Sequence, residues 1–206
     1  MTSWGRLTKR VLDLAVSLLA LAALALPLLL CAAMVALEDR GPVLFRQRRV
    51  GKNGILFRVW KLRTMTEMRT DPRTPDRLRA DDPRITRVGR FLRRTGIDEL
   101  PQLLNVLSGA MSLVGPRPTL SYQVREYTDY ERRRLEVRPG ITSLAVASGR
   151  NALPWKKRIE LDVWYVDHWS LLLDLRILLQ TVWHVLVKQE GVHGDDGAND
   201  VFFDAV

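Results

Sequence analysis

Cysteine and histidine are scarce in this chain of 206 residues. Its one cysteine, Cys31, excludes a disulfide within the chain and says little about the redox compartment. The three histidines, His168, His184 and His193, are too scattered to form a transition-metal site. Low-complexity stretches and internal repeats are also absent. At this length, a hydrophobic content of 47% is enough for one compact domain with a buried core, plus a membrane element.

Acidic residues are outnumbered, since 23 Asp and Glu stand against 32 Lys and Arg. Most of the excess lies between Arg40 and Arg94, with 17 basic and 5 acidic residues. Such a chain attracts nucleic acid, acidic lipid headgroups or phosphorylated small molecules. A nucleic-acid binder would interleave exposed aromatics with these charges or present a recognition helix. We expect Phe45, Phe57 and Trp60 in the core, and no helix-turn-helix pattern occurs, so we expect no nucleic-acid partner.

Charge is absent from Leu14 to Leu37, a run of 24 residues that is long enough to cross a bilayer. A cleavable signal peptide is excluded, because its apolar core would be only about 7–15 residues long. Pro27, in the middle of the run, is compatible with a kinked spanning helix or with a re-entrant helix that returns to the same face. Both flanks are basic, so the positive-inside rule favours neither alternative.

A second apolar segment, Leu171 to Val187, predicts an amphipathic helix with a wide leucine face. One narrow stripe holds Asp174, Thr181, His184 and, just past the segment, Lys188, and leucines cover the remainder. Four of the six tryptophans lie in this C-terminal part of the chain, and tryptophan favours the headgroup layer. A helix packed on the domain core would show the same pattern. We interpret one or more of these helices as interfacial.

The middle of the chain predicts a β-hairpin and two helices. Residues 43–65 alternate apolar and basic around a Lys-Asn-Gly turn, with Phe45, Val50, Ile55, Phe57 and Val59 on the strands. A charged loop over 69–82 precedes a helix that begins near Arg84 or Thr86 and ends at Gly96.

The adjacent carboxylates Asp98 and Glu99 precede Pro101, which is tolerated only near a first helical turn. We therefore expect the next helix to begin between Ile97 and Glu99. In the simplest interpretation Asp98 is an N-cap and Glu99 an acid favoured by the helix dipole. Neighbouring residues on a helix point about 100° apart, so the doublet is not a facing acid/base pair.

Several motifs occur in an order that resembles the bacterial sugar transferases, which are monotopic polyprenol-phosphate phosphoglycosyl transferases: "GPVLFRQRRVGKNG", "FRVWKLRTM", "DPRITRVGRFLRR", "DELPQLLNVLSGAMSLVGPRP", "RPGIT" and "SGRN". The likeness runs from about Thr8 to Lys188 and matches the small members of the family. It implies an α+β, mainly helical membrane-surface domain with a small β-hairpin and a re-entrant N-terminal helix broken at Pro27. The expected parts are an anchor (1–40), a catalytic domain with interfacial helices (41–190) and a flexible acidic tail (191–206).

The resemblance also implies an activity. Such enzymes pass a sugar-1-phosphate from a UDP-sugar to undecaprenyl phosphate, release UMP and initiate glycan assembly. By this likeness Asp98 carries a covalent phosphosugar and Glu99 helps to hold Mg²⁺. The implied location is the cytoplasmic face of the bacterial inner membrane, in contact with phospholipids. The assembly, including a homodimer, stays open, and so do the donor sugar and the pathway.

This chemistry is consistent with the residue types present. A carboxylate can attack phosphorus as a covalent nucleophile, but anionic reactants approach it only where cations offset their charge. We assign Lys61, Arg93, Arg117 and Arg150 to phosphate oxygens, since arginine forks bind them bidentately. Each of these cations is alternatively a surface or structural charge.

Four positions depart from the family pattern: Leu26, Ala110, Ser143 and Val146 stand where serine, aspartate, glycine and glutamine are frequent. The last two put the identity of the donor in doubt. The alternative function is a catalytically silent membrane scaffold of a glycan-assembly complex. Loss of the Asp98–Glu99 doublet would indicate such a scaffold, and the doublet is intact.

Overall fold

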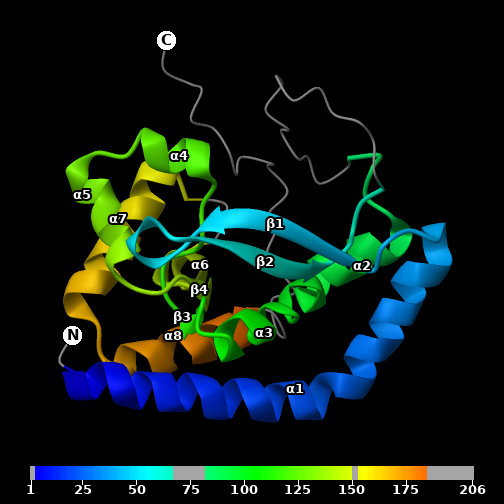
Figure 1. The fold of residues 1–206 in the computed structure, drawn as a ribbon, viewed down its shortest axis with the longest axis horizontal. Coiled ribbons are helices and arrows are strands. Elements are labelled where there is room, and N and C mark those ends of the chain that lie inside the picture. Colours follow the sequence, from blue (N-terminus) through cyan, green and yellow to red (C-terminus); the bar gives the residue numbers. More distant parts are fainter. Residues whose placement is uncertain (1–2, 67–81, 150–152, 185–206) are drawn as a thin grey trace.

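The computed structural model describes residues 3–66, 82–149 and 153–184. These residues are mostly helical, with two small sheets and one long apolar N-terminal helix (Figure 1). The helices are α1 (Ser3–Asp39), α2 (Arg87–Thr95), α3 (Gln102–Leu107), α4 (Ser121–Arg125), α5 (Asp129–Arg132), α6 (Leu144–Ser148), α7 (Trp155–His168) and α8 (Leu171–Trp183). The 3₁₀ turns are η1 (Lys52–Gly54), η2 (Ile97–Glu99) and η3 (Arg133–Glu136), and the strands are β1 (Leu44–Val50), β2 (Leu56–Leu62), β3 (Ser112–Val114) and β4 (Gly140–Thr142).

The predicted hairpin is confirmed as β1 and β2, which pair antiparallel from Leu44 opposite Leu62 to Val50 opposite Leu56. Asn53 and Gly54 make the turn with positive φ values of 54° and 79°, which asparagine and glycine tolerate best. Two details were wrong: Ile55 lies outside the strands, and Phe45 is 46% exposed instead of buried. Val59 is buried on one face of the hairpin, and Val50 and Leu62 are buried on the other, so both faces contribute side chains to the core.

Helix α1 is assigned as one α-helix through Pro27, the only proline within it, and the ribbon is visibly bent (Figure 1). It is long and apolar enough to cross a membrane, and few residues of its most apolar window are buried. Whether it is a broken, re-entrant helix stays a prediction, as does the division into parts at residues 40 and 190. The tail from 191 to 206 lies outside the described residues.

Both ends of α1 are bound to the rest of the protein. Near its start, Arg10 donates hydrogen bonds to the carbonyls of Val106 and Leu107, 2.7 and 3.1 Å away. At its end, Glu38 accepts hydrogen bonds from the first backbone amides of α2, and Asp39 forms an ion pair with Arg63. A carboxylate is favourable at a helix N-terminus because it complements the exposed N–H groups and the helix dipole.

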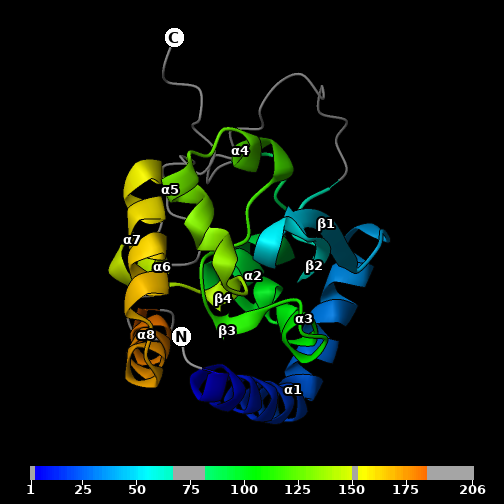
Figure 2. The ribbon, with the colours of Figure 1, turned by 60° about the vertical axis from the view of Figure 1, so that its left-hand side comes forward.

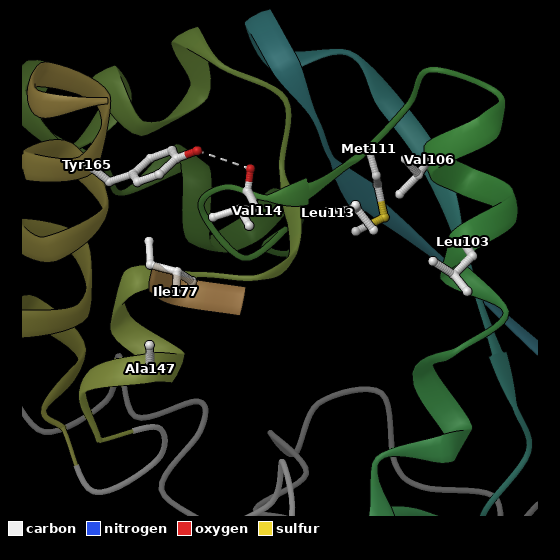
Figure 3. Close-up of a cluster of buried hydrophobic side chains, with 8 residues drawn as sticks. All are labelled: Leu103, Val106, Met111, Leu113, Val114, Ala147, Tyr165 and Ile177. Carbon is white, nitrogen blue, oxygen red and sulfur yellow. Dashed lines mark hydrogen bonds between the residues drawn. The ribbon is translucent and has the colours of Figure 1, made fainter. Parts of the chain in front are cut away.

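The largest buried cluster joins segments that are distant in sequence (Figure 3). Its members come from α3, the connection to β3, β3 itself, α6, α7 and α8: Leu103, Val106, Met111, Leu113, Val114, Ala147, Tyr165 and Ile177. The Tyr165 hydroxyl points from α7 toward the carbonyl oxygen of Val114, 3.2 Å away. Strand β3 pairs in parallel with β4 beside this cluster, so the segment that follows Val114 starts from a fixed point.

The predicted amphipathic C-terminal helix is confirmed as α8, which lies below α7 and beside the N-terminal part of α1 (Figure 2). Asp174 faces inward, where it is buried and accepts hydrogen bonds from Lys9, Tyr165 and Trp169. The outward face carries Arg176 and is otherwise mainly apolar, with Leu172, Leu175, Leu179, Val182 and Trp183 all more than half exposed. A leucine face turned away from the core is the arrangement expected of an interfacial helix.

Candidate active site

The carboxylate doublet occupies a 3₁₀ turn between two helices. The predicted helix before it is confirmed as α2, which Thr86 caps and Gly96 ends in the left-handed conformation with φ of 72°. The chain then forms η2, and the next α-helix begins only at Gln102, after Pro101. The helix start expected between Ile97 and Glu99 is thus a 3₁₀ turn, with the α-helix starting later, and the interpretation of Asp98 as an N-cap was wrong. Proline at 101 fixes φ and offers no N–H, so one tight turn separates the doublet from α3.

Glu99 is held by two cations from different elements. Lys61, on β2, places its Nζ 2.7 Å from Oε1. Arg117 donates from Nη1 to Oε2 at 3.1 Å and from Nη2 to Oε1 at 2.5 Å, the bidentate geometry in which a guanidinium fits a carboxylate. Pro116 and Pro118 flank Arg117 and restrict its backbone, so the guanidinium is presented from a stiff segment.

Asp98 lies beside Glu99 in a different state. The side chain is buried, and its Oδ1 has no hydrogen-bond partner among the described residues. Burial, together with the charge of Glu99, raises the pKa of Asp98 to about 6, although Lys61, Arg93 and Arg117 oppose the shift. Desolvation disfavours the ionised form, and nearby cations restore it. At neutral pH the group is therefore mostly an anion whose Oδ1 receives no hydrogen bond from the described residues.

The remaining predicted cations differ in their placement. Arg93, on α2, is half-buried, and its Nη1 lies 3.9 Å from the sulfur of Met65. Burial lowers the pKa of Arg93, while the charges of Asp98, Asp82 and Glu99 oppose that shift. The structure thus brings Lys61, Arg93 and Arg117 to the doublet, whereas Arg150 lies outside the described residues.

Mg²⁺ fits this donor set. The ion is usually bound by one or two carboxylates together with substrate phosphates and water, so a cluster of three protein ligands is not required. No such cluster occurs in the part of the chain that the structure describes. The carboxylates of Asp98 and Glu99 are the adjacent oxygen donors that could hold such an ion together with substrate phosphates.

Two functional candidates escaped sequence reasoning, Arg134 on η3 and Asp162 on α7. They form a buried ion pair directly behind Arg117, whose backbone carbonyl accepts a hydrogen bond from Arg134 at 3.0 Å. A signal was present for Asp162. It falls three residues after Ile159 and immediately before Val163, on a helix face that is otherwise apolar and buried. A charge at a core-facing position needs a partner.

The departures from the family pattern have different surroundings. Ser143 is buried and caps α6, because its hydroxyl accepts a hydrogen bond from the amide of Val146 at 3.1 Å. Ser143 and Val146 therefore lie together at the start of α6. Thr142, the residue before Ser143, forms a hydrogen bond with Thr181 of α8. Leu26, beside Pro27, is 67% exposed. Ala110 lies in the turn between α3 and β3.

Comparisons with known proteins agree with one another. The family described as bacterial sugar transferase matches residues 4–188. The chain is 48% identical over 181 residues to an "Uncharacterized sugar transferase EpsL" of Bacillus subtilis, covering 88% of each protein. It is 47% identical to a "UDP-glucose:undecaprenyl-phosphate glucose-1-phosphate transferase" of Caulobacter vibrioides, covering 85% of this chain and 68% of the relative. It is 39% identical to an "Undecaprenyl-phosphate galactose phosphotransferase" of Salmonella typhimurium, covering 92% of this chain but only 42% of that relative.

Proposed function

Because the chain belongs to the bacterial sugar transferase family, we propose that it transfers a sugar-1-phosphate from a UDP-sugar to undecaprenyl phosphate and releases UMP. The observation that carries the proposal is the state of Asp98. It is buried, largely ionised at neutral pH, without a partner at Oδ1, and within the field of three cations. A resting structural charge would be paired, whereas a nucleophile must keep an oxygen available.

The reaction proceeds in two displacements at phosphorus. In the first, an Asp98 oxygen attacks the β-phosphorus of the UDP-sugar, an O–P bond forms, and the bond to the UMP oxygen breaks. In the second, an oxygen of the lipid phosphate attacks the same phosphorus and the bond to Asp98 breaks, which restores the carboxylate. A covalent intermediate of this kind divides one difficult transfer into two easier steps.

Charge decides whether these anions can meet. Glu99, fixed by Lys61 and Arg117, keeps two cations close to Asp98, and Arg93 adds a third. These groups are in place before the substrate arrives, so little reorganisation accompanies the reaction. Mg²⁺, held by Asp98 and Glu99, supplies further neutralisation of the phosphates when bound. Arg150 is proposed to contact the phosphates as well, by its motif alone.

The membrane arrangement follows from α1. Its two ends bind the same domain, through Arg10 and through Asp39, while the leucines between them face outward. A helix that crossed the bilayer would deliver its ends to opposite sides, roughly 30 Å apart. This supports a re-entrant helix broken at Pro27, with the outward leucines of α8 in the lipid interface. The cytoplasmic face is proposed for the catalytic domain from the family resemblance alone.

The activity is tested by measuring UMP release by purified, detergent-solubilised protein. A panel of UDP-sugars is supplied with and without undecaprenyl phosphate and Mg²⁺. We expect release with one or a few donors, dependent on the metal. Donor labelled at the β-phosphorus should label the protein, and lipid acceptor should remove that label. Silence across the panel from folded protein in lipid would instead support the scaffold.

The topology has its own test. Ser3→Cys and Arg40→Cys are introduced one at a time into a Cys31→Ser background, and each is labelled with a membrane-impermeant maleimide in spheroplasts and in inverted vesicles. A re-entrant α1 exposes both positions in the inverted vesicles only. Labelling of the two positions from opposite sides would show that α1 crosses the membrane.

A further inference from the structure

Arg134 and Asp162 form the most deeply buried ion pair that the described residues contain, with side chains 3% and 2% exposed. Removing two charges from water is costly, and well-packed apolar residues of similar volume often stabilise a core as well or better. Stability alone therefore does not explain the pair. Its other hydrogen bonds, and the segment that they bind, suggest a further role.

Those bonds go to the segment that carries Arg117. Arg134 Nη2 donates to the backbone carbonyl of Arg117 at 3.0 Å, and Nη1 donates to the Tyr127 hydroxyl at 2.5 Å. The Tyr127 hydroxyl in turn lies 3.3 Å from Oγ1 of Thr119, to which it donates. The segment is therefore held on both sides of Pro118, and Asp162 fixes the guanidinium that does so.

Arg117 connects this network to the doublet through its two hydrogen bonds to Glu99. Building on the function proposed above, we infer that the Arg134–Asp162 pair is a positioning device for the reaction, which fixes the backbone of Arg117 and thereby orients the Glu99 carboxylate beside Asp98. Arg134 and Asp162 have no hydrogen bond or ion pair with Asp98 or Glu99 among the contacts described for them. They act on the site through Arg117, as outer groups act on the ligands of a metal.

The test replaces the pair with apolar residues, Arg134→Met with Asp162→Leu, so that no unpaired charge is left buried. The chain offers a matched control: Arg133 and Asp167 bridge the same two elements, η3 and α7, but both are 39% exposed. Arg133→Met with Asp167→Leu should therefore change the same connection without touching Arg117. UMP release and thermal unfolding are measured for both double variants.

A positioning role predicts that the Arg134/Asp162 double variant folds, with a melting temperature close to wild type, and loses about 10- to 100-fold in kcat. The control pair should retain wild-type kcat. If the pair has only a structural role, any double variant that folds should keep the wild-type kcat. Wild-type kcat in the folded Arg134/Asp162 variant would overturn the inference.

A second comparison asks whether the effect passes through Glu99. In a Glu99→Gln background the same double substitution should cost little further activity, because groups that act through one another are not additive. An equal further loss in that background would overturn the inference. Should the apolar pair fail to fold, Tyr127→Phe removes the hydroxyl that joins Arg134 to Thr119 but leaves the Arg134–Asp162 pair and the bond to the Arg117 carbonyl in place. A smaller loss of kcat with unchanged melting temperature is then expected.

A readout without turnover separates this inference from the proposed function. Mg²⁺ alone should raise the melting temperature of the wild type, and this shift should be smaller in the Arg134/Asp162 variant but intact in the control pair. If the wild type releases no UMP yet shows this pattern, the transfer reaction is wrong and the positioning of the doublet stands. Equal shifts in all three proteins would reject the positioning role.

Discussion

Arg117 and Glu99 meet through two hydrogen bonds, 3.1 and 2.5 Å long, in which the whole guanidinium fork engages the whole carboxylate. One partner comes from a 3₁₀ turn and the other from a proline-flanked loop 18 residues later. The contact fixes the orientation of Glu99 and keeps a positive charge near Asp98, so its geometry matters as much as its charge.

Arg117→Lys tests that geometry. Lysine keeps the charge but cannot make the fork, so we expect kcat to fall roughly 10²-fold, as for loss of one preorganised donor, with little change in thermal stability. Arg125→Lys, at an exposed position on α4, is the control and should leave kcat unchanged. Unaltered turnover by Arg117→Lys would mean that only the charge is needed.

Asp98→Asn should abolish UMP release and at the same time stabilise the protein. The pKa of Asp98 is about 6 in the folded state, against about 3.9 for an unperturbed aspartate, so ionisation opposes folding. At neutral pH and without Mg²⁺ the penalty is about 3 kcal/mol. Turnover near the wild-type rate would rule out the covalent mechanism.

The sign of this linkage gives a pH test. Because the folded state binds the proton more tightly, wild-type stability should fall as pH rises from about 4 to about 6 and level off above that range. The stability difference between Asp98→Asn and wild type should therefore be small at pH 4 and full at pH 7. Urea unfolding at several pH values in detergent measures it, and a pH-independent difference would contradict the assignment.

Asp174→Asn should loosen the contact between α1 and α8. The carboxylate accepts hydrogen bonds from Lys9 and Tyr165, both at 2.6 Å, and from Trp169 at 3.0 Å. Removing its charge leaves Lys9 facing a neutral group in a mostly buried place, so we expect a loss of about 3–5 kcal/mol in unfolding free energy. Glu160→Gln, which breaks an exposed pair with Lys157, should cost less than about 1 kcal/mol.

Gly89→Ala should destabilise the protein even though alanine is the better helix former. A Cβ atom at this position in α2 would lie 2.1 Å from the carbonyl oxygen of Thr64, which is backbone and cannot rotate away. Alanine would normally add about 0.5–1 kcal/mol in a helix, and here we expect a loss of more than that. Arg90→Ala, exposed on the same helix, isolates the propensity effect in thermal unfolding.

Local patterns were sufficient where the structure is local. The hairpin register follows from alternation and a Lys-Asn-Gly turn, and α2 lies between the capping residues Thr86 and Gly96. The parallel pairing of β3 with β4 was not predictable, because strands of three residues are too short for a periodic signal. The two strands are also far apart in the sequence, and only tertiary packing brings them together.

The site divides in the same way. Asp98 and Glu99 were found from their motif, and Lys61, Arg93 and Arg117 were named with them. Their division of labour was not foreseen, since Lys61 and Arg117 bind Glu99 and leave Oδ1 of Asp98 unpartnered among the described residues. Which cation contacts which carboxylate depends on how β2, η2 and the Arg117 loop pack against one another. The spacing of these residues in the sequence does not determine that packing.

The inward face of α1 sets a limit on how a soluble form of this enzyme could be engineered. Asp13 of α1 accepts a hydrogen bond from the backbone amide of Leu113. Further along the helix, Cys31 and Val35 pack against Leu62 and Leu92. Deleting residues 1–40 would strip those partners from the domain and leave an aggregation-prone apolar surface in their place. Replacing the outward leucines of α1 and α8 with polar residues would preserve the core, and that is the route by which water solubility should be sought.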